Sequence, residues 1–351
     1  MQPHQPPIRT EALPAVGGIL GSDPAHFVVE EIPAYAPSGE GEHLYVRIEK
    51  VGENTADVAR LLSRAANVPH QEVGFAGLKD RNAVTRQWFS LPARGAPPDA
   101  WNLPPSVKVL ETSRHKNKLR TGHLIGNRFV LTLSDVPECG LERARAIASV
   151  LAEKGLGNYY GAQRFGRGGS NLEKALAWAQ KPAGGDRRQK NRFDEKMLPS
   201  VLQSEAFTRY LSRRLDHPEA LLDGEVVRLA GAGRHFVVER ASDELPRLLE
   251  KDIVLTGPMW GPKTVQSTGP ALELEKEALA SLELSEEGLA RLERAAPGAR
   301  RDLLLFTEDL ELDEPAPGTL EIAFSLPSGS YATQILREFT RQPWLELRGG
   351  S

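Results

Sequence analysis

The sequence predicts an α+β protein in which the two ends of the chain build one domain and the middle builds a second. Segments with period-2 alternation of apolar residues lie near both ends, at 44–49 and 320–326, and such segments form strands. Segments with helical spacing of apolar residues occur among them. Glycine and arginine become frequent after residue 155, where we place a domain boundary. We therefore expect residues 1–154 and 304–351 to form the first domain, with a mixed or antiparallel sheet, and 155–303 an inserted α+β domain of ordinary size.

The first domain is expected to begin with two strands and a helix. Residues 27–32 and 44–49 are strand-like, and the proline- and glycine-containing stretch 33–42 between them is a loop. Asn54 and Thr55 can cap a helix that ends before Pro69. Further strands are predicted at 73–76, 84–91, 107–110 and 124–133, followed by a helix at 141–154 that Gly155 ends.

The inserted domain is predicted to contain helices around short strands. Helices are predicted at 171–178, at 198–215 and in the acidic region 272–296, and short strands at 225–229, 235–239 and 252–255. Residues 301–306 are expected to form a strand that returns to the first domain. After the strand at 320–326, Ser330 can cap a final helix.

Composition is typical of a soluble globular protein, with 40% hydrophobic and 26% charged residues among 351. No stretch of about twenty apolar residues is present, so we expect no membrane span. Residues 1–7 lack the features of a secretory signal and are expected to be a disordered tail. The single cysteine, Cys139, excludes an internal disulfide and fits a reducing compartment, so we expect a cytoplasmic protein.

The net charge of −3 conceals a strong segregation of charge along the chain. Two runs are basic: Lys108, Arg114, Lys116, Lys118, Arg120 and Arg128, then Lys181, Arg187, Arg188, Lys190, Arg192 and Lys196. Acidic residues gather later, at 273–287 and 308–314. Charge runs usually form solvated faces. Phosphate binding responds to local potential, however, so two separate basic runs also favour RNA binding.

Metal and nucleotide-cofactor chemistry are not indicated. The histidines are scattered without metal-ligand spacing, and one cysteine cannot supply a zinc motif. No dinucleotide fingerprint follows a strand, and residues 257–264 lack the spacing of a phosphate-binding loop. We therefore expect side chains alone to do the chemistry, without a cofactor or metal.

One charged turn between two predicted strands is the best candidate for a reactive site. In the turn 79–82, Asp80 stands between Lys79 and Arg81. Nearby cations lower the pKa of a carboxylate, so we expect Asp80 to be ionised and available as a nucleophile or base. The alternative is an ordinary turn in which Asp80 and Asn82 only bind backbone N–H groups.

Four ordered motifs across nearly the whole chain resemble those of the TruD family of tRNA pseudouridine synthases. They are residues 39–44 (GEGEHL), 75–85 (FAGLKDRNAVT), 158–166 (NYYGAQRFG) and 326–333 (LPSGSYAT). The resemblance implies a pseudouridine-synthase-like catalytic domain with an inserted TRUD domain, and Asp80 as the catalytic aspartate. It also implies tRNA as the partner, with no cofactor and no obligate protein partner. The family's usual target is position 13 of a glutamate-type tRNA.

The same resemblance implies roles for further residues, one position at a time. It places Phe27, Asn127, Phe129 and Tyr331 around the uracil, with Tyr331 standing where the family more often has Phe. The cations expected on the RNA backbone are Lys79, Arg81, Lys116, Lys118, Arg120, Arg164 and Arg167. The alternatives are a core role for the aromatic residues, a turn role for Asn127 and a hinge role for the loop 163–169.

One departure from the family leaves the charge partner of Asp80 unassigned. Many relatives have a basic residue shortly before the first strand, where this chain has Gly21-Ser22-Asp23-Pro24. Lys79 and Arg337 are the candidates that the sequence offers. The departure also keeps open an RNA-binding or RNA-folding protein without turnover. A metal-dependent phosphodiesterase using Asp80 is a third possibility, although the motif has no second carboxylate nearby.

Overall fold

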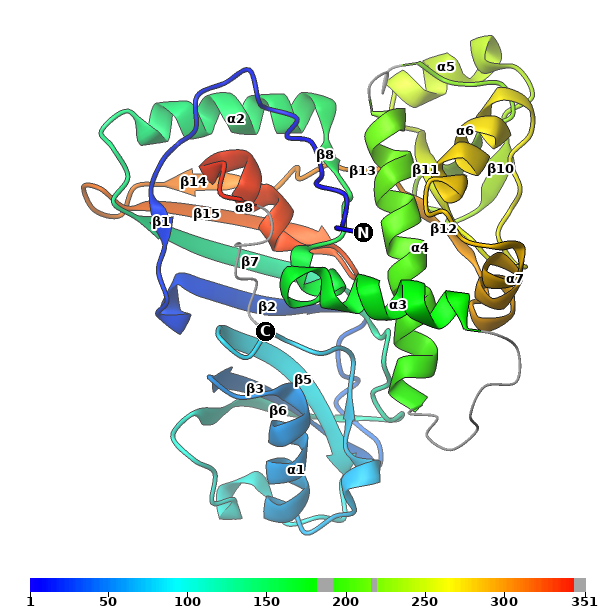
Figure 1. Cartoon of the computed structure of the whole chain (residues 1–351). Helices are drawn as coiled ribbons and strands as arrows, with labels where there is room; N and C mark the ends of the chain where they lie inside the picture. The colour runs from blue at the N-terminus through cyan, green and yellow to red at the C-terminus, as the bar shows by residue number, and fades with distance from the viewer. Residues whose placement is uncertain (182–191, 216–219, 344–351) are drawn as a thin grey trace. The chain divides into compact units, whose positions relative to one another are not determined.

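The computed structural model describes residues 1–181, 192–215 and 220–343, and the chain divides into two compact units. The sheet unit comprises Thr10–Glu153 and Thr307–Arg341, so it is built from two separate parts of the chain. The helical unit comprises Met1–Arg9 and Lys154–Phe306. Figure 1 shows the elements of both units.

The sheet unit is organised around a nine-stranded sheet, confirming the predicted α+β class. Its path is β14-β15-β7-β2-β5-β3-β6, with β1 beside β7 and β4 beside β5. The strands are β1 (Ile19–Leu20), β2 (Phe27–Pro33), β3 (His43–Val51), β4 (Gly74–Phe75), β5 (Val84–Pro92), β6 (Val107–His115), β7 (Leu124–Ser134), β14 (Glu311–Asp313) and β15 (Leu320–Pro327). The sheet is mixed, because β2 and β5 run parallel while the other pairs are antiparallel.

Strand register lines up side chains from five strands on one face of this sheet. Residues paired directly across neighbouring strands point to the same face. One such row runs from β15 to β3 through Phe324, Phe129, Val29, Thr85 and Lys50. The next row includes Leu326, Asn127 and Glu31. This face therefore carries three of the residues that the sequence analysis placed at the uracil, Phe27, Asn127 and Phe129.

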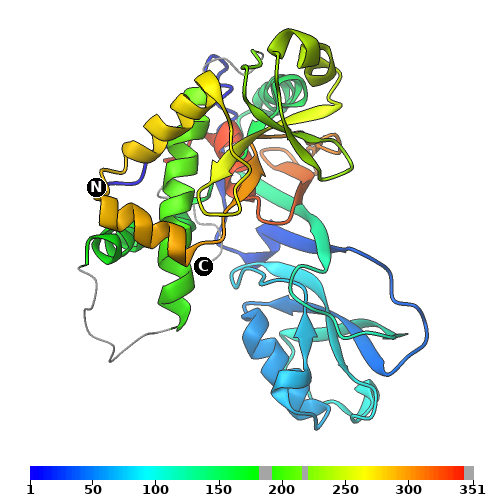
Figure 2. The same ribbon diagram turned by 90° about the vertical axis from the view of Figure 1, so that its right-hand side faces the viewer.

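Two helices cover opposite halves of that face. Figures 1 and 2 show α1 (Thr55–Ala65) over β3 and β5 and α8 (Ala332–Thr340) over β7 and β15. Val58 and Leu62 of α1 are fully buried and belong to the same apolar cluster as Ile48 and Phe89 of the sheet. The i, i+4 spacing of these helix residues explains why α1 presents one apolar stripe to the sheet. A third helix of this unit is α2 (Gly140–Lys154).

The helical unit packs helices beside a small sheet. Its helices are α3 (Ser170–Gln180), α4 (Arg192–Arg214), α5 (Ala241–Leu249), α6 (Gly269–Ala280) and α7 (Glu286–Ala295). Its four-stranded sheet has the order β10-β9-β11-β12, formed by His235–Val237, Val226–Leu229, Ile253–Met259 and Ala299–Asp302. A separate pair joins β8 (Leu156–Gly157) to β13 (Leu304–Leu305). None of the helices in the described ranges has the length and apolar character needed to cross a bilayer.

The expectation of a disordered N-terminal tail is wrong. Met1–Arg9 belongs to the helical unit, and Pro3 and Pro6 are buried. The backbone N–H of His4 donates to Glu205 Oε1 at 3.0 Å, and the His4 ring lies 3.0 Å from Ser212 Oγ. Local composition missed this packing because the two partners lie 201 and 208 residues further along the chain.

Smaller expectations are also corrected. Residues 301–306 do not return to the first domain as one strand, because they form the end of β12 and then β13 within the helical unit. Helix α5 was not predicted. Strand β6 continues to His115, so Arg114 lies in a strand, and the N-cap of α8 is Tyr331 rather than Ser330.

Candidate active site

Asp80 lies on the loop that leads into β5, and a hydrogen-bond network fixes this loop against α1. The backbone N–H of Lys79 donates to Thr55 Oγ1 at 2.9 Å, at the start of α1. Thr55 in turn donates to Gln87 Oε1 at 3.0 Å, and Gln87 Nε2 donates to the Gly77 carbonyl at 3.1 Å. Gly77 and Lys79, just before Asp80, are therefore tied to regular structure, which limits the motion of the loop that carries its carboxylate.

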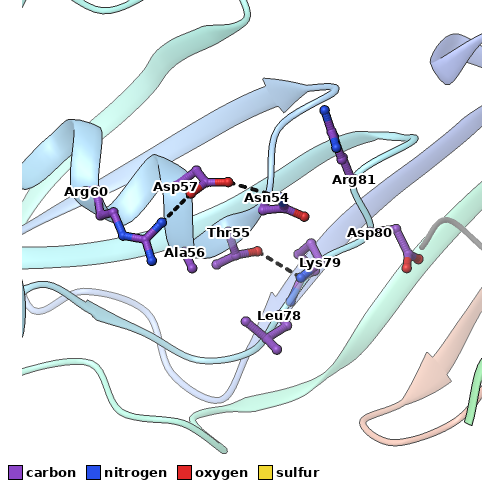
Figure 3. Close-up of a pocket in the computed structure, with 9 residues that line it drawn as sticks. All are labelled: Asn54, Thr55, Ala56, Asp57, Arg60, Leu78, Lys79, Asp80 and Arg81. Atoms are coloured by element: carbon purple, nitrogen blue, oxygen red, sulfur yellow. Dashed lines mark hydrogen bonds and ion pairs between the residues drawn. The ribbon is translucent and has the colours of Figure 1, made fainter. Parts of the chain in front are cut away.

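The loop and the N-terminus of α1 line an open pocket of about 440 Å³. Its lining residues are Asn54, Thr55, Ala56, Asp57, Arg60, Leu78, Lys79, Asp80 and Arg81. Figure 3 shows the side chains of Asp80 and Arg81 leaving the loop in different directions. Asp57 is occupied by Arg60, at 2.5 Å, so Asp80 is the lining carboxylate without a salt bridge among the described residues. A carboxylate that lines a pocket and has no salt-bridge partner is free to contact a bound ligand.

The charge environment of Asp80 differs from the one that the sequence suggested. Burial raises the pKa of the Asp80 carboxyl to about 6, while the positive charges of Lys50 and, less strongly, Lys79 act in the opposite direction. Lys79 lowers the pKa as expected, but the expected net lowering of the Asp80 pKa is wrong, because desolvation exceeds the attraction of the nearby cations. Arg81 is exposed, and its Nε donates to the Gly52 carbonyl at 3.1 Å.

Lys79 is enclosed within the sheet unit. Its Nζ lies 2.7 Å from Glu31 Oε2, and the two side chains are 3% and 1% exposed. Glu31 also accepts a hydrogen bond from the Trp88 backbone N–H at 3.1 Å. This corrects the expectation that Lys79 contacts the RNA backbone, since its ammonium is bound inside the protein.

Three of the predicted uracil residues, Phe27, Phe129 and Asn127, lie on the same sheet face as Glu31. Phe27 and Phe129 meet edge to face with ring centroids 6.2 Å apart, and Phe129 stacks on Phe324 at 5.5 Å. Phe27 and Phe129 are 5% and 6% exposed, so both belong to the core as well. The structure thus brings the two aromatic residues together but leaves little free ring surface on either of them.

Asn127 is placed directly across from Glu31, the partner of Lys79. Asn127 is therefore next to Glu31 of β2, which in turn pairs with Lys79 of the Asp80 loop. The Oδ1 atom of Asn127 is buried and has no hydrogen-bond partner among the described residues. A buried acceptor of this kind costs about 1–3 kcal/mol, so a donor from a ligand would be favourable. Tyr331 is half-buried at the start of α8, a short turn after β15.

Some of the cations predicted to contact RNA are bound to other groups of the protein, and others are exposed. Lys116 and Arg120 are exposed between β6 and β7, although Lys116 pairs with Glu40 at 2.7 Å. Lys118 Nζ donates to the Gln71 carbonyl at 2.6 Å. In the second basic run, Arg187, Arg188 and Lys190 lie outside the described residues.

Arg164 and Arg167 belong to the helical unit and differ from each other. Arg164 is held by Ser200 and Ser204, the latter at 3.1 Å, and its guanidinium lies 5.7 Å from the centre of the Tyr160 ring. Arg167 is exposed, beside Gly168, whose φ of +61° is a conformation that favours glycine. Within the described parts of the chain, no three His, Cys, Asp or Glu side chains group closely enough to hold a metal ion.

A family model for tRNA pseudouridine synthase D (TruD) matches residues 8–172 and 194–339. The chain belongs to the TruD family. This confirms the resemblance read from the four motifs, and it assigns the chain to the tRNA pseudouridine synthases, isomerases that convert uridine in tRNA to pseudouridine.

Individual TruD relatives match over nearly their full length. A tRNA pseudouridine synthase D from Anaeromyxobacter dehalogenans is 40% identical over 339 residues, covering 95% of this chain and 96% of the relative. One from Thermus thermophilus is 40% identical over 342 residues, covering 96% and 92%. A crystal structure of a TruD protein from Methanosarcina mazei has a TM-score of 0.75 and 23% identity over 97% of both chains, which shows the shared fold.

The sequence analysis missed Lys50, a buried lysine that contacts the Asp80 loop. The structure places it on β3, fully buried, with the Asp80 loop as its neighbour. A signal was present, because Val46, Ile48 and Lys50 follow the same period-2 alternation and the first two are core residues. A lysine in the phase of a buried face is unusual, and its position could have been noted from the sequence alone.

Proposed function

We propose that Asp80 of this TruD protein is the catalytic aspartate that isomerises one specific uridine of tRNA to pseudouridine. The observation that carries the proposal is a half-buried carboxylate on an open pocket, with two lysine charges acting on it. With a pKa of about 6, roughly nine-tenths of Asp80 is ionised at pH 7, so it is available as a nucleophile or base.

The reaction places few other demands on the protein. The bond between uracil N1 and the ribose carbon breaks, the base rotates, and C5 bonds to the same carbon and then loses its proton. These steps need one carboxylate and a pocket that retains the free base. The target uridine must also leave its stack, which costs a few kcal/mol that binding along the RNA offsets.

We propose that Asn127 and the nearby aromatic residues hold the uracil. The unpartnered Oδ1 of Asn127 suits the N3–H donor of the base. Phe27, the first residue of β2, and Tyr331, at the start of α8, supply aromatic walls, and Phe129 contacts the Phe27 ring edge to face.

We propose that exposed or half-buried cations of both units contact the RNA backbone. They are Arg81, Lys116, Lys118, Arg120, Arg164 and Arg167, each described above, without Lys79. Position 13 of a glutamate-type tRNA is the proposed target, on the basis of family membership.

The test is to incubate the protein with unmodified tRNA and to map pseudouridine at each position. We expect one modified site, at position 13, with wild-type protein and none with Asp80→Ala. Equal yields from the two proteins contradict the role of Asp80. A single modified site elsewhere corrects the proposed position and leaves the role of Asp80 standing.

A further inference from the structure

Lys50 is a lysine in the core of the sheet unit. Its side chain is 0% exposed, and it follows Val46 and Ile48 on the buried face of β3. Removing an ammonium from water is costly, and burial lowers the pKa of Lys50 to about 8. An apolar residue would fill this position at lower cost, so the cation requires a specific explanation.

The contacts of Lys50 connect two loops, one of which carries Asp80. Its Nζ donates to the backbone carbonyl of Asp80 at 2.8 Å and to that of Glu53 at 2.8 Å. Glu53 lies just after β3 and Asp80 just before β5, so one ammonium ties together loops from two neighbouring strands. An ammonium has three donors, and these two contacts determine where the loop before β5 sits.

Lys50 also differs from Lys79 in how its charge is used. Lys79 is neutralised by Glu31 at 2.7 Å, whereas the hydrogen-bond partners of Lys50 within the described residues are both carbonyl oxygens. Three charged groups shift the pKa of Lys50 through their charge, and from the largest effect to the smallest they are Asp80, Lys79 and Glu53. The charges of Lys50 and Lys79 shift the pKa of Asp80. Lys50 is therefore the cation whose field is least cancelled by a contacting carboxylate.

We propose that Lys50 is the positioning residue of Asp80, fixing its loop through the Asp80 carbonyl and keeping its carboxylate ionised through an unneutralised positive charge. The inference rests on the proposed role of Asp80 as the reactive group. Lys50, on β3, would then be the charge partner of Asp80 in a chain that has no basic residue at positions 21–24, before the first predicted strand. Lys50 itself does not touch the substrate.

The test compares Lys50→Met and Lys50→Arg with Arg47→Met, a loss of positive charge from the same strand on its opposite face. We expect the acid limb of kcat/KM against pH to move up by about one unit in Lys50→Met, because the opposing charge is gone. Lys50→Arg keeps the charge and should keep the wild-type acid limb, as should Arg47→Met. At pH 7, kcat should fall severalfold in Lys50→Met while the Kd for tRNA stays within about twofold, since no RNA contact is lost.

A merely structural role predicts different results. It predicts an unmoved acid limb in Lys50→Met. A lower urea midpoint does not separate the two roles, because losing the two hydrogen bonds to backbone carbonyls destabilises the protein in either case. The inference is overturned if the acid limb of Lys50→Met coincides with that of wild type. It is also overturned if the acid limb moves as far in Arg47→Met as in Lys50→Met.

Direct titration of the Asp80 carboxyl by ¹³C NMR, assigned with Asp80→Asn, gives a reading even if Lys50→Met is inactive. We expect its midpoint to be higher in Lys50→Met than in wild type, and equal midpoints overturn the inference even when Asp80→Asn is inactive. An active Asp80→Asn protein contradicts the proposed function instead, whatever the titration shows.

Discussion

Two faces of the same strands carry similar charged residues with different consequences. On one face, Glu30 pairs with Arg47, and the side chains of both are about one-third exposed, at 36% and 30%. On the other face, Glu31 pairs with Lys79, with side chains 1% and 3% exposed. Glu30 and Glu31 are consecutive in the chain. Side-chain alternation along the strand therefore decides that Glu30 stays in water and that Glu31 enters the interior beside the Asp80 loop.

The comparison teaches that burial, more than the number of charges, makes a group reactive. Exposed ion pairs contribute about 0–1 kcal/mol, because water already stabilises both partners. In the interior the same charges interact strongly with each other and with nearby carboxylates. Asp80 and Lys50 lie on the buried side of this division, and both have pKa values moved by burial.

The largest expected difference between the two faces is in catalysis. Asp80→Asn should lower kcat by at least about a thousandfold, since the neutral amide is neither nucleophile nor base. Glu30→Gln, on the exposed face, should keep kcat within about twofold. Rates of pseudouridine formation on one tRNA measure both. A similar loss in the two variants would remove the distinction between the faces.

The second-largest expected difference between the two faces is in the free energy of unfolding. Glu31→Gln leaves the Lys79 ammonium buried without its carboxylate, so the free energy of unfolding should fall by about 3–5 kcal/mol. Glu30→Gln should lower it by less than about 1 kcal/mol. Urea unfolding of the two variants gives the comparison, with circular dichroism as the probe. Equal losses would mean that the Lys79–Glu31 pair is no more important than a surface pair.

The pH dependence of wild-type activity should show the desolvation of Asp80. Because the pKa is raised to about 6, kcat/KM should fall about tenfold per unit as pH drops below that value. Stability should respond in the opposite sense. The folded pKa lies above the ordinary value of 3.8, so the contribution of Asp80 to stability is full below that value and is lost as pH rises through about 6. An acid limb near pH 4 in wild type would contradict the raised pKa.

Asn127 offers a smaller test on the same sheet face. Asn127→Ala removes the proposed acceptor for uracil N3–H, so kcat/KM should fall by about ten- to a hundredfold. Thr132→Ala, on the opposite face of β7, is the matched control and should change kcat/KM by less than about twofold. Substrate kinetics with the same tRNA measure both. Equal values for the two variants would exclude Asn127 from base recognition.

The smallest effect is expected from exposed cations on the surface of the sheet unit. Replacing Lys116 and Arg120 together by Met should weaken tRNA binding severalfold at low salt and reduce the salt slope by about two. Lys276→Met, which removes an exposed lysine paired with Glu273 in the helical unit, should leave the slope unchanged. Titrations at several salt concentrations decide between a binding surface and an ordinary solvated run.

Much of the fold was predictable because local patterns and packing agree. The alternation at 44–49 and 320–326 corresponds to β3 and β15, and the spacing of Val58 and Leu62 corresponds to the buried stripe of α1. The N-terminal segment was not predicted, since it has no strong local pattern. Helix α5 was also not predicted; its apolar residues have helical spacing, but it contains Pro246, a residue that argues against a helix interior. Packing of His4 beside Glu205 depends on residues far apart in the chain.

The sequence by itself determined the TruD family and the α+β class and pointed to Asp80 as the candidate catalytic residue, because motifs and alternation are local properties of the chain. The tertiary structure decided the charge environment of that carboxylate. It buried Lys79 against Glu31, exposed Arg81 and brought Lys50 from another strand to the Asp80 loop. The physical reason is that a pKa depends on solvent access and on distances through space, and neither can be read from neighbours in the sequence.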